Sequence, residues 1–322
     1  MKKLLTLILA LAMALSLVAC GSSDKKDDSG EKTYTVGVVQ LVQHEALDAA
    51  TKGFTDALKE ALGDKVNVVV KNASGDSNTC GTIVNGFLAD NVDLIMANAT
   101  PALQAAASAT STVPILGTSV TDYATALEIA NWTGTVGGNI SGTSDLAPLD
   151  QQVAMLQELF PNAKKVGMLF CSSEPNSKYQ VDEVTKLLSN AGITCTEFAF
   201  TDSNDVSSVT QKACDASDVL FIPTDNTAAS NTEAIANILV PAGVPAICGE
   251  EGICKGCGVA TLSINYYDLG VTTGKMAAKI LTGEANISEM PIEFTEATPK
   301  YNPTMCETLG IEPLDGYTAI ED

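Results

Sequence analysis

Loops rich in small hydrogen-bonding side chains follow the apolar runs of this 322-residue chain. They lie at 40–44, 98–101, 118–122, 172–177, 224–227 and 249–251. Each of these loops precedes a predicted helix, so its backbone N–H groups carry a positive partial charge. Serine, threonine, asparagine and aspartate at such a position are, taken singly, ordinary helix caps. The same chemistry in loops of both halves of the chain favours a shared binding site.

The charged residues restrict what this site can hold. All 18 basic residues are lysine, so no guanidinium group is present to grip a carboxylate through two hydrogen bonds. An anionic group would be held by hydroxyls and helix N-termini, for which Thr100 and the helix after it are suited. Acids at Asp122, Asp225 and Glu250 suit an ammonium group. The pattern predicts a zwitterionic ligand.

The sequence argues against catalysis and against nucleic acid. The only histidine is His44, and GxSxG, GxxxxGK[ST] and GxGxxG motifs are absent. Glu250 and Glu251 could form a carboxylate pair, but adjacent side chains usually point to different sides. A net charge of −21 opposes the phosphate neutralisation that nucleic-acid binding requires. We expect no enzyme activity, no cofactor, no metal and no nucleic-acid partner.

The N-terminus carries export features. Lys2 and Lys3 precede an apolar run over 4–19, which is short for a membrane span of about 20 residues and is typical of a secretory signal. The run ends in LVAC followed by glycine, which resembles the bacterial lipobox, with Cys20 as the lipid-carrying residue. An ordinary signal peptide with an incidental cysteine is the alternative.

A polar tether is predicted after the signal peptide. The signal is expected at 1–20, and 21–33 begins with GSSDKKDDSGEK, which has too little apolar surface to fold. We therefore expect an extracytoplasmic protein held at the cell membrane by the lipid on Cys20.

Eight further cysteines follow, at Cys80, Cys171, Cys195, Cys214, Cys248, Cys254, Cys257 and Cys306. In an exported protein they could form disulfides, but several lie in apolar runs where a free cysteine is a small hydrophobe. The CxxC at 254–257 has no second pair, and one histidine makes zinc improbable. A local disulfide or two free thiols is favoured over a redox centre.

Strands and helices alternate along the chain in two series. In the first, strands are expected at 34–40, 66–71, 93–98 and 113–117. A polar, glycine-rich crossing follows at 134–145. The second series has strands at 165–170, 193–198, 219–223, 244–248 and 259–263, and a final helix at 267–281. This alternation is typical of parallel sheets covered by helices on both faces.

We therefore predict an α/β fold with two doubly wound parallel-sheet lobes joined by a hinge, with crossings near 141–147 and 263–267. The first lobe is expected to comprise 34–144 and 266–284, and the second 145–265 and 285–322. In such sheets ligands bind beyond the carboxyl ends of the strands. The polar loops lie at those ends.

Several segments together resemble the ABC-transporter substrate-binding family of the tryptophan/tyrosine-receptor type. They are VGVVQLVQHEALDAATKGFTDAL, ATPALQAA, SVTDY, GTSDLAP, SSEPNS, PTDN and NYYDLGVTTGKMAAKIL, in order over about 35–285. The resemblance implies a type I periplasmic-binding-protein fold, an ABC permease as partner, a monomer, and import of an aromatic or other apolar amino acid. The cysteine-rich GEEGICKGCG stretch departs from the family pattern.

The resemblance also implies a set of ligand-binding residues. They are His44, Thr100, Ser119, Asp122, Ser144, Asp145, Asn176, Ser177, Asp225, Asn226 and Glu250. A sugar, nucleoside or autoinducer receptor on the same fold is the alternative, and an enzyme is a weaker one. An aromatic content of 5% argues against a site walled by stacked rings.

Overall fold

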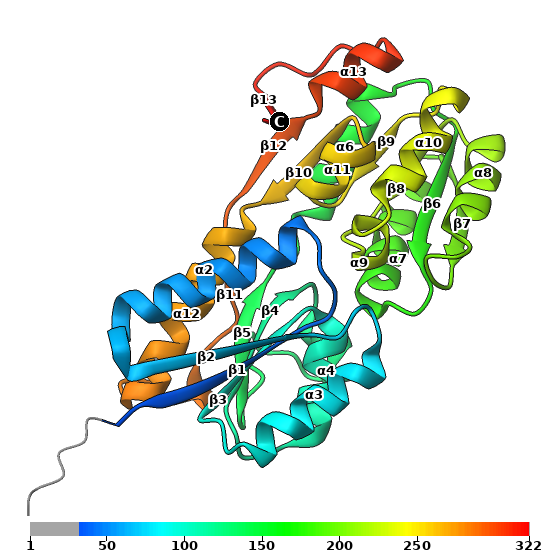
Figure 1. The fold of residues 1–322 in the computed structure, drawn as a ribbon. Coiled ribbons are helices and arrows are strands. Elements are labelled where there is room, and N and C mark those ends of the chain that lie inside the picture. Colours follow the sequence, from blue (N-terminus) through cyan, green and yellow to red (C-terminus); the bar gives the residue numbers. More distant parts are fainter. Residues whose placement is uncertain (1–31, 322) are drawn as a thin grey trace, which may run out of the picture. The chain divides into compact units, whose positions relative to one another are not determined.

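The computed structural model describes residues 32–321. From Tyr34 onward the chain forms one compact unit that contains two sheets, each with its own helices (Figure 1). The predicted signal peptide, nearly all of the predicted tether and Cys20 lie outside the described residues. No helix in the described part of the chain has both the length and the apolar content needed to cross a membrane.

The first lobe contains a parallel sheet of six strands in the order β11-β5-β4-β3-β1-β2. The strands are β1 (Tyr34–Gln40), β2 (Val66–Asn72), β3 (Leu94–Asn98), β4 (Ile115–Val120), β5 (Ile140–Ser144) and β11 (Glu293–Phe294). Its helices are α2 (Glu45–Leu62), α3 (Ser77–Ala89), α4 (Thr100–Ala109), the short α5 (Tyr123–Ala126) and α12 (Tyr266–Thr282). A 3-10 turn, η1 (Gly63–Lys65), follows α2, and η2 (Ile287–Glu289) precedes β11. Neighbouring parallel strands must be joined by a crossover connection, usually a helix, which explains why strands and helices alternate in the sequence.

Helices α2 and α12 lie side by side on one face of this sheet, and α3 and α4 cover the other (Figure 1). Glycine allows the close approach of α2 and α12. A Cβ at Gly270 would lie 2.0 Å from the Ala50 carbonyl oxygen, and one at Gly53 would lie 2.1 Å from that of Tyr267. Any larger residue at these positions would force the helices apart. The last long helix of the chain is thus fixed to the first lobe.

The second lobe contains a seven-stranded sheet in the order β13-β12-β10-β9-β8-β6-β7. Its strands are β6 (Lys165–Cys171), β7 (Thr194–Phe200), β8 (Val219–Ile222), β9 (Ala246–Cys248), β10 (Ala260–Ile264), β12 (Ala297–Tyr301) and β13 (Thr318–Ala319). Its helices are α6 (Leu149–Leu159), α7 (Pro175–Asn190), α8 (Val206–Ala216), α9 (Asn226–Ala229), α10 (Thr232–Ala242), α11 (Glu251–Cys257) and α13 (Pro303–Leu309). The sheet is parallel except that β12 runs antiparallel to β10.

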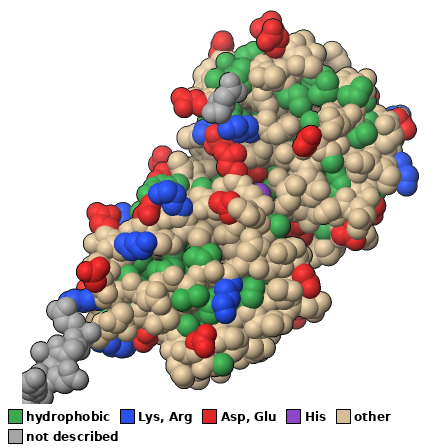
Figure 2. All heavy atoms as spheres, viewed as in Figure 1, with side chains coloured by type: hydrophobic (Ala, Val, Ile, Leu, Met, Phe, Trp, Pro, Cys, Tyr) green, Lys and Arg blue, Asp and Glu red, His purple; other side chains and the backbone are tan. Residues whose placement is uncertain are grey.

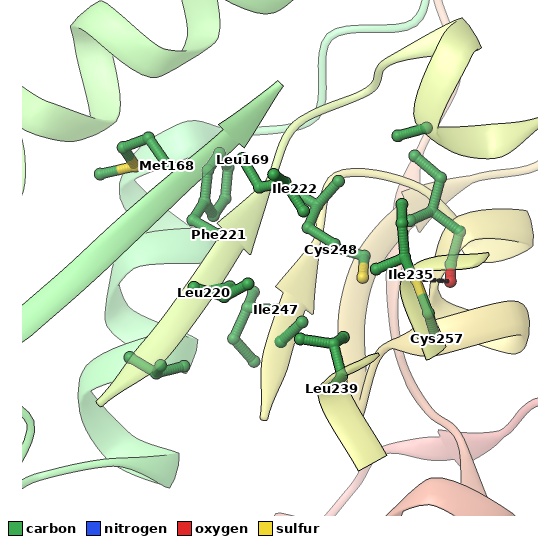
Figure 3. Close-up of a cluster of buried hydrophobic side chains, with 14 of the residues drawn as sticks. Met168, Leu169, Leu220, Phe221, Ile222, Ile235, Leu239, Ile247, Cys248 and Cys257 are labelled. Atoms are coloured by element: carbon green, nitrogen blue, oxygen red, sulfur yellow. Dashed lines mark hydrogen bonds between the residues drawn. The ribbon is translucent and has the colours of Figure 1, made fainter. Parts of the chain in front are cut away.

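All eight cysteines of the described residues are free thiols. Cys248, Cys254 and Cys257 are buried in the core of the second lobe, where Figure 3 shows Cys248 and Cys257 among Phe221, Ile222 and other apolar side chains. Cys257 donates to the Ile253 carbonyl oxygen within α11. The sequence left open a local disulfide or two free thiols at the CxxC pair, Cys254 and Cys257. The structure has free thiols, which pack in the core of the second lobe.

The two expected lobes and their parallel sheets are confirmed, but two segments differ from the prediction. The segment at 140–144 was expected to belong to a crossing and is the buried strand β5. This strand carries several hydroxyl side chains and few apolar ones. Its hydroxyls can be buried because they form hydrogen bonds inside the lobe, as Thr143 does with Thr118 and Thr273. A strand of this kind lacks the apolar run that sequence patterns rely on.

The assignment of all of 285–322 to the second lobe is wrong at its start. Strand β11 pairs with β5 of the first lobe, whereas β12 pairs with β10 of the second. The chain therefore passes between the lobes three times, after β5, after β10 and after β11. Strand β11 is only two residues long, so it has no recognisable strand pattern in the sequence. The third crossing was therefore not predicted.

Candidate functional site

A small cavity lies where the two lobes meet. It is lined by His44, Leu47, Ser119, Asp145, Asn176, Thr224, Asp225, Asn226, Ala229, Glu250 and Tyr266. Ser119 lies near the end of β4, and the other residues follow β1 and β5 in the first lobe and β6, β8, β9 and β10 in the second. Strand-end loops far apart in sequence therefore line one cavity, as expected for doubly wound sheets. The free space inside it is about 10 Å³, roughly enough for one water molecule, so its lining residues are tightly closed around it.

Seven of the predicted residues line this cavity and four do not. The four are Thr100, Asp122, Ser144 and Ser177. Asp122 caps α5 by accepting from the Thr125 backbone N–H at 2.7 Å. The Ser144 hydroxyl donates to the Thr121 carbonyl oxygen at 2.8 Å. These two side chains support the local backbone.

Asp145 stands at the first crossing and is 3% exposed. Its Oδ2 accepts a hydrogen bond of 3.0 Å from the hydroxyl of Tyr266, the first residue of α12. Its Oδ1 is buried and has no hydrogen-bond partner. Burial raises the pKa of Asp145 to about 6. A buried carboxylate oxygen without a donor is costly, and a ligand ammonium group would satisfy it.

Asp225 is also buried, but its carboxylate is fully occupied. It accepts hydrogen bonds of 2.7 Å each from the Cys171 backbone N–H, the Ser177 hydroxyl and the Ala228 backbone N–H. These bonds tie the end of β6 to the first turns of α7 and α9. Burial and the nearby Glu174 raise the pKa of Asp225. Asp225 and Ser177 therefore shape the second lobe's side of the cavity.

Glu250 caps α11 in the same manner. Its carboxylate accepts from the backbone N–H groups of Gly252 at 2.7 Å and Ile253 at 2.5 Å. Burial raises its pKa to about 7. Of the three acids that line the cavity, only Asp145 keeps an oxygen available for a ligand.

His44 connects the two lobes. Its Nε2 lies 3.2 Å from the Asn226 side-chain oxygen, and burial lowers its pKa, which favours the neutral ring. Asn226 is held in turn by Glu174, to which its side-chain amide donates at 2.6 Å. Glu174 also accepts from Thr227, through the backbone N–H and the hydroxyl, each at 2.8 Å.

Two hydroxyls on the first lobe's side are buried without partners, those of Thr100 and Ser119. Both stand at strained backbone. Ala99, which precedes Thr100, has a φ of 92°, and Ser119 has a φ of 53°. A register shift in the β4–β5 pairing falls between Gly117 and Val120 and includes Ser119. Strain of this kind costs of order 1–3 kcal/mol and concentrates at ligand sites.

Sequence reasoning missed several residues that the structure places at the cavity. Glu174, Thr224, Tyr266, Leu47 and Ala229 line it or hold its lining residues. Glu174 and Tyr266 belong to the SSEPNS and NYYDLG segments, so the segments were identified but the residues were not singled out. A tyrosine at the start of a helix is usually just partly buried, so the sequence offers no reason to place Tyr266 at the site. Its role there is evident only from its hydrogen bond to Asp145.

A larger hollow of about 240 Å³ adjoins the cavity, and Asn226 lines both. Its lining includes Leu41, Val42 and Pro101 from the first lobe and Glu174, Thr227 and Asn231 from the second. No lysine or histidine lines it. On the face of the molecule seen in Figure 2, acidic side chains are spread among scattered lysines without a large basic area.

Comparison with known proteins gives concordant matches. The family model described as "ABC transporter substrate binding protein" matches residues 35–315. The tyrosine-binding protein of Clostridioides difficile (strain R20291) is 34% identical over 309 residues, covering 92% of this chain and 89% of that protein.

Two solved structures are similar at comparable identity. One is an ABC domain in complex with L-Trp from Streptococcus pneumonia, with a TM-score of 0.85 and 32% identity over 90% of this chain and 100% of that one. The other is the ligand-free, open structure of a substrate binding protein with adhesive properties from Clostridium difficile, with a TM-score of 0.68 and 34% identity over 90% of this chain and 99% of that one. The chain therefore belongs to the ABC transporter substrate binding protein family, whose members bind solutes and are not enzymes.

Proposed function

We propose that this protein is the extracytoplasmic, lipid-anchored receptor of an ABC importer and that it binds an aromatic amino acid between its lobes. The relatives of known ligand support the ligand class, since one is described as tyrosine-binding and another was solved with L-Trp. The absence of arginine supports a site in which hydroxyls and backbone N–H groups hold the carboxylate.

The observation that carries the proposal is the buried, unpartnered Oδ1 of Asp145. In our proposal the ligand's ammonium group donates to this oxygen, while the hydroxyl of Ser119 donates to the ligand's carboxylate. Each of these groups is buried, and hydrogen bonds to ionised partners at such positions are about twice as strong as neutral ones. Asp145 lies at a crossing between the lobes, so a contact there favours the closed arrangement.

Comparison of the two solved relatives supports lobe closure as the mechanism. The body matches the L-Trp complex with a TM-score of 0.85 and the ligand-free, open structure with 0.68, although the identities are 32% and 34%. In our proposal this difference reflects a lobe arrangement closer to that of the liganded relative. Hinge motion about the three crossings would open the cavity for entry.

Calorimetric titration with a panel of amino acids, sugars and nucleosides tests the ligand class. We expect saturable binding of tyrosine or tryptophan and none of glucose or adenosine. A ligand at 100 times its dissociation constant would add about 2.7 kcal/mol to stability, which a thermal shift detects. Binding of a sugar alone would overturn the proposal.

Membrane attachment is tested separately. Cys20 is proposed to carry the lipid, so Cys20→Ser in the full chain should move the protein from the membrane fraction to the soluble extracytoplasmic fraction. Cys80→Ser, which alters a buried cysteine of the body, is the matched control and should leave the protein at the membrane. Continued attachment of the Cys20 variant would refute lipidation.

A further inference from the structure

Glu174 is a buried acid of the second lobe whose carboxylate is held by a neighbouring helix. It is the N-cap residue of α7, but its side chain does not cap that helix. Its carboxylate accepts instead from the backbone N–H groups of Asn226, at 3.0 Å, and Thr227, at 2.8 Å, the first two residues of α9. The side chains of the same two residues donate to it as well, and the Asn176 amide does so at 3.3 Å. Both oxygens of Glu174 are therefore occupied within the second lobe.

These bonds fix which way the Asn226 amide points. A carboxylate whose two oxygens both face backbone N–H groups acts as an acceptor, so the amide NH2 of Asn226 must face Glu174, as it does at 2.6 Å. The reversed amide would bring two acceptor oxygens together. The amide oxygen is thus left for the first lobe, where it lies 3.2 Å from Nε2 of His44. An amide oxygen only accepts, so the proton of this bond belongs to Nε2.

We propose that Glu174 is a positioning residue for lobe closure. It holds the Asn226 amide with its oxygen toward the first lobe, and that oxygen accepts from the Nε2–H group of His44 once the lobes close. The bond favours the closed arrangement without a contribution from the ligand. This inference rests on the lobe closure of the proposed function, but not on the class of ligand named there.

The surroundings of His44 suit a neutral donor. His44 is partly buried and directly precedes α2 of the first lobe. Burial lowers the pKa of its ring, against the opposing effects of the Asn226 hydrogen bond and of the acids Glu174, Asp48 and Glu45. A neutral imidazole has a single N–H group, and the Asn226 oxygen requires it on Nε2. Nδ1 is then left as an acceptor.

Orientation before closure is what Glu174 contributes. An unrestrained asparagine would lose rotamer freedom and select one amide orientation only when the lobes meet, which costs binding energy. The bonds that restrain Asn226 lie entirely within the second lobe, so they do not depend on closure. Lys255 and Glu45 form an ion pair across the lobes at 3.9 Å, but both are exposed and such pairs contribute little. The His44–Asn226 bond is the better organised of these two links.

A bond that acts on closure alone should strengthen the binding of every ligand by the same factor. The apparent affinity of a ligand is its intrinsic affinity scaled by the fraction of protein in the competent state, and that fraction is a property of the free protein. A residue that touches the ligand changes the affinities of different ligands by different factors. This difference separates positioning from contact.

Nitrogen-15 NMR of the imidazole ring tests the bond itself. His44 is the only histidine in the chain, so the ring signals need no assignment if the full chain is prepared without a histidine tag. We expect the ring proton on Nε2 and protected from exchange with water, in the free protein or after addition of L-tyrosine. Asn226→Ala should remove the protection. A ring proton on Nδ1, or equally fast exchange in wild type and variant under both conditions, would overturn the proposal.

Glu174→Gln tests the positioning role. Glutamine has one acceptor oxygen for two backbone N–H groups and can also donate, so the Asn226 amide is free to turn its NH2 toward His44. We expect the ring proton to move in part to Nδ1. The affinities for L-tyrosine and L-tryptophan, measured by calorimetry, should fall by the same factor, about fivefold for the loss of one neutral hydrogen bond.

Glu183→Gln is the matched control, because Glu183 lies on α7 and pairs with Lys186 at the surface of the second lobe. The ring proton and both affinities should be unchanged in this variant. Circular dichroism establishes that the variants fold. If Glu174→Gln leaves the ring proton and the affinities as in the wild type, Glu174 only caps α9 and the proposal is wrong.

A pair of His44 variants serves if Glu174→Gln does not fold. His44→Gln keeps an N–H donor at about the reach of Nε2 and should bind both amino acids nearly as the wild type does, whereas His44→Ala should weaken both about fivefold. Unequal losses for the two amino acids would show that His44 contacts the ligand and would overturn the proposal. If neither amino acid binds the wild type, the proposed function fails, and the ring proton of the free protein still decides whether the bond exists.

Discussion

The two sides of the interlobe cavity are built differently. On the second lobe, Asp225 and Glu250 have their carboxylates occupied by backbone N–H groups and, for Asp225, by the Ser177 hydroxyl. On the first lobe and its crossing, Asp145 and Ser119 each retain a buried oxygen without a partner, and on the second lobe the side-chain oxygen of Asn176 does so. The acids of the second lobe therefore have their hydrogen bonds before any ligand arrives, whereas Asp145, Ser119 and Asn176 keep oxygens that a ligand can use.

Similar residue types therefore have different roles at similar strand ends. Polar side chains that satisfy each other contribute to rigidity, and truncating one leaves buried partners unpaired. Polar atoms that remain unpaired at a closed interface are the ones a ligand can use. This distinction generates four predictions, given from the largest expected effect to the smallest.

Asp225→Ala should destabilise the protein more than any other change at the cavity. It removes the acceptor of three hydrogen bonds of 2.7 Å and leaves three buried donors unpaired. We expect a loss of about 3–4 kcal/mol in the free energy of unfolding, measured in urea. A variant that is as stable as the wild type but no longer binds would show that Asp225 contacts the ligand directly and would remove the contrast between the two sides.

Asp145→Asn should leave the fold intact and weaken binding. The amide keeps the shape and can still accept from Tyr266, but it loses the charge that attracts an ammonium group. We expect about a 100-fold weaker affinity, or about 2.7 kcal/mol, by calorimetry. Asp122→Asn is the matched control because Asp122 caps α5 outside the cavity, and its affinity should stay within twofold. A change of less than threefold for Asp145→Asn would argue against the ammonium site.

Two serine variants compare the sides directly. Ser119→Ala removes a hydroxyl that has no partner in the protein, so it should lower affinity about fivefold with little change in stability. Ser177→Ala removes the donor to Asp225, so it should cost about 1 kcal/mol of stability with little change in affinity. The reverse result would mean that the two lobes have exchanged the roles assigned to them.

Stability and affinity should respond to pH in opposite directions. Burial raises the pKa of Asp145 to about 6 and that of Glu250 to about 7, and burial together with Glu174 raises the pKa of Asp225, so at these three acids the folded state binds protons more strongly than the unfolded chain. Burial lowers the pKa of His44, which acts in the opposite direction but at one group only. The ligand-free protein should therefore lose a few degrees of melting temperature as the pH rises from 5 to 8. Ligand binding requires ionised Asp145 and should weaken as the pH falls below about 6.

Thermal scans and titrations at pH 5 and pH 8 test this. Asp145→Asn should lose the pH dependence of binding near pH 6 while keeping the part of the stability change that arises from Glu250 and Asp225. Affinity that is constant over this range in the wild type would contradict a role for an ionised Asp145.

Much of the fold follows from local patterns. Continuous apolar strands such as 165–170 and 219–223, each followed by a helix, predicted parallel sheets, and the restart of the series after a polar stretch predicted two lobes. The strand-end loops that line the cavity were predicted for the same reason. Strand β5 was missed because its hydroxyls replace apolar side chains, and β11 because two residues form no pattern.

The sequence by itself determined the chemistry available at the cavity, which is acids, hydroxyls and one histidine without a single arginine. Only the tertiary structure decided which of these groups are used up within the protein. Asp145, Asp225 and Glu250 are alike as residues in polar loops, but their hydrogen-bond partners come from backbone N–H groups and a tyrosine brought close by folding. Whether an oxygen is left for a ligand depends on that geometry, which residue type and spacing do not encode.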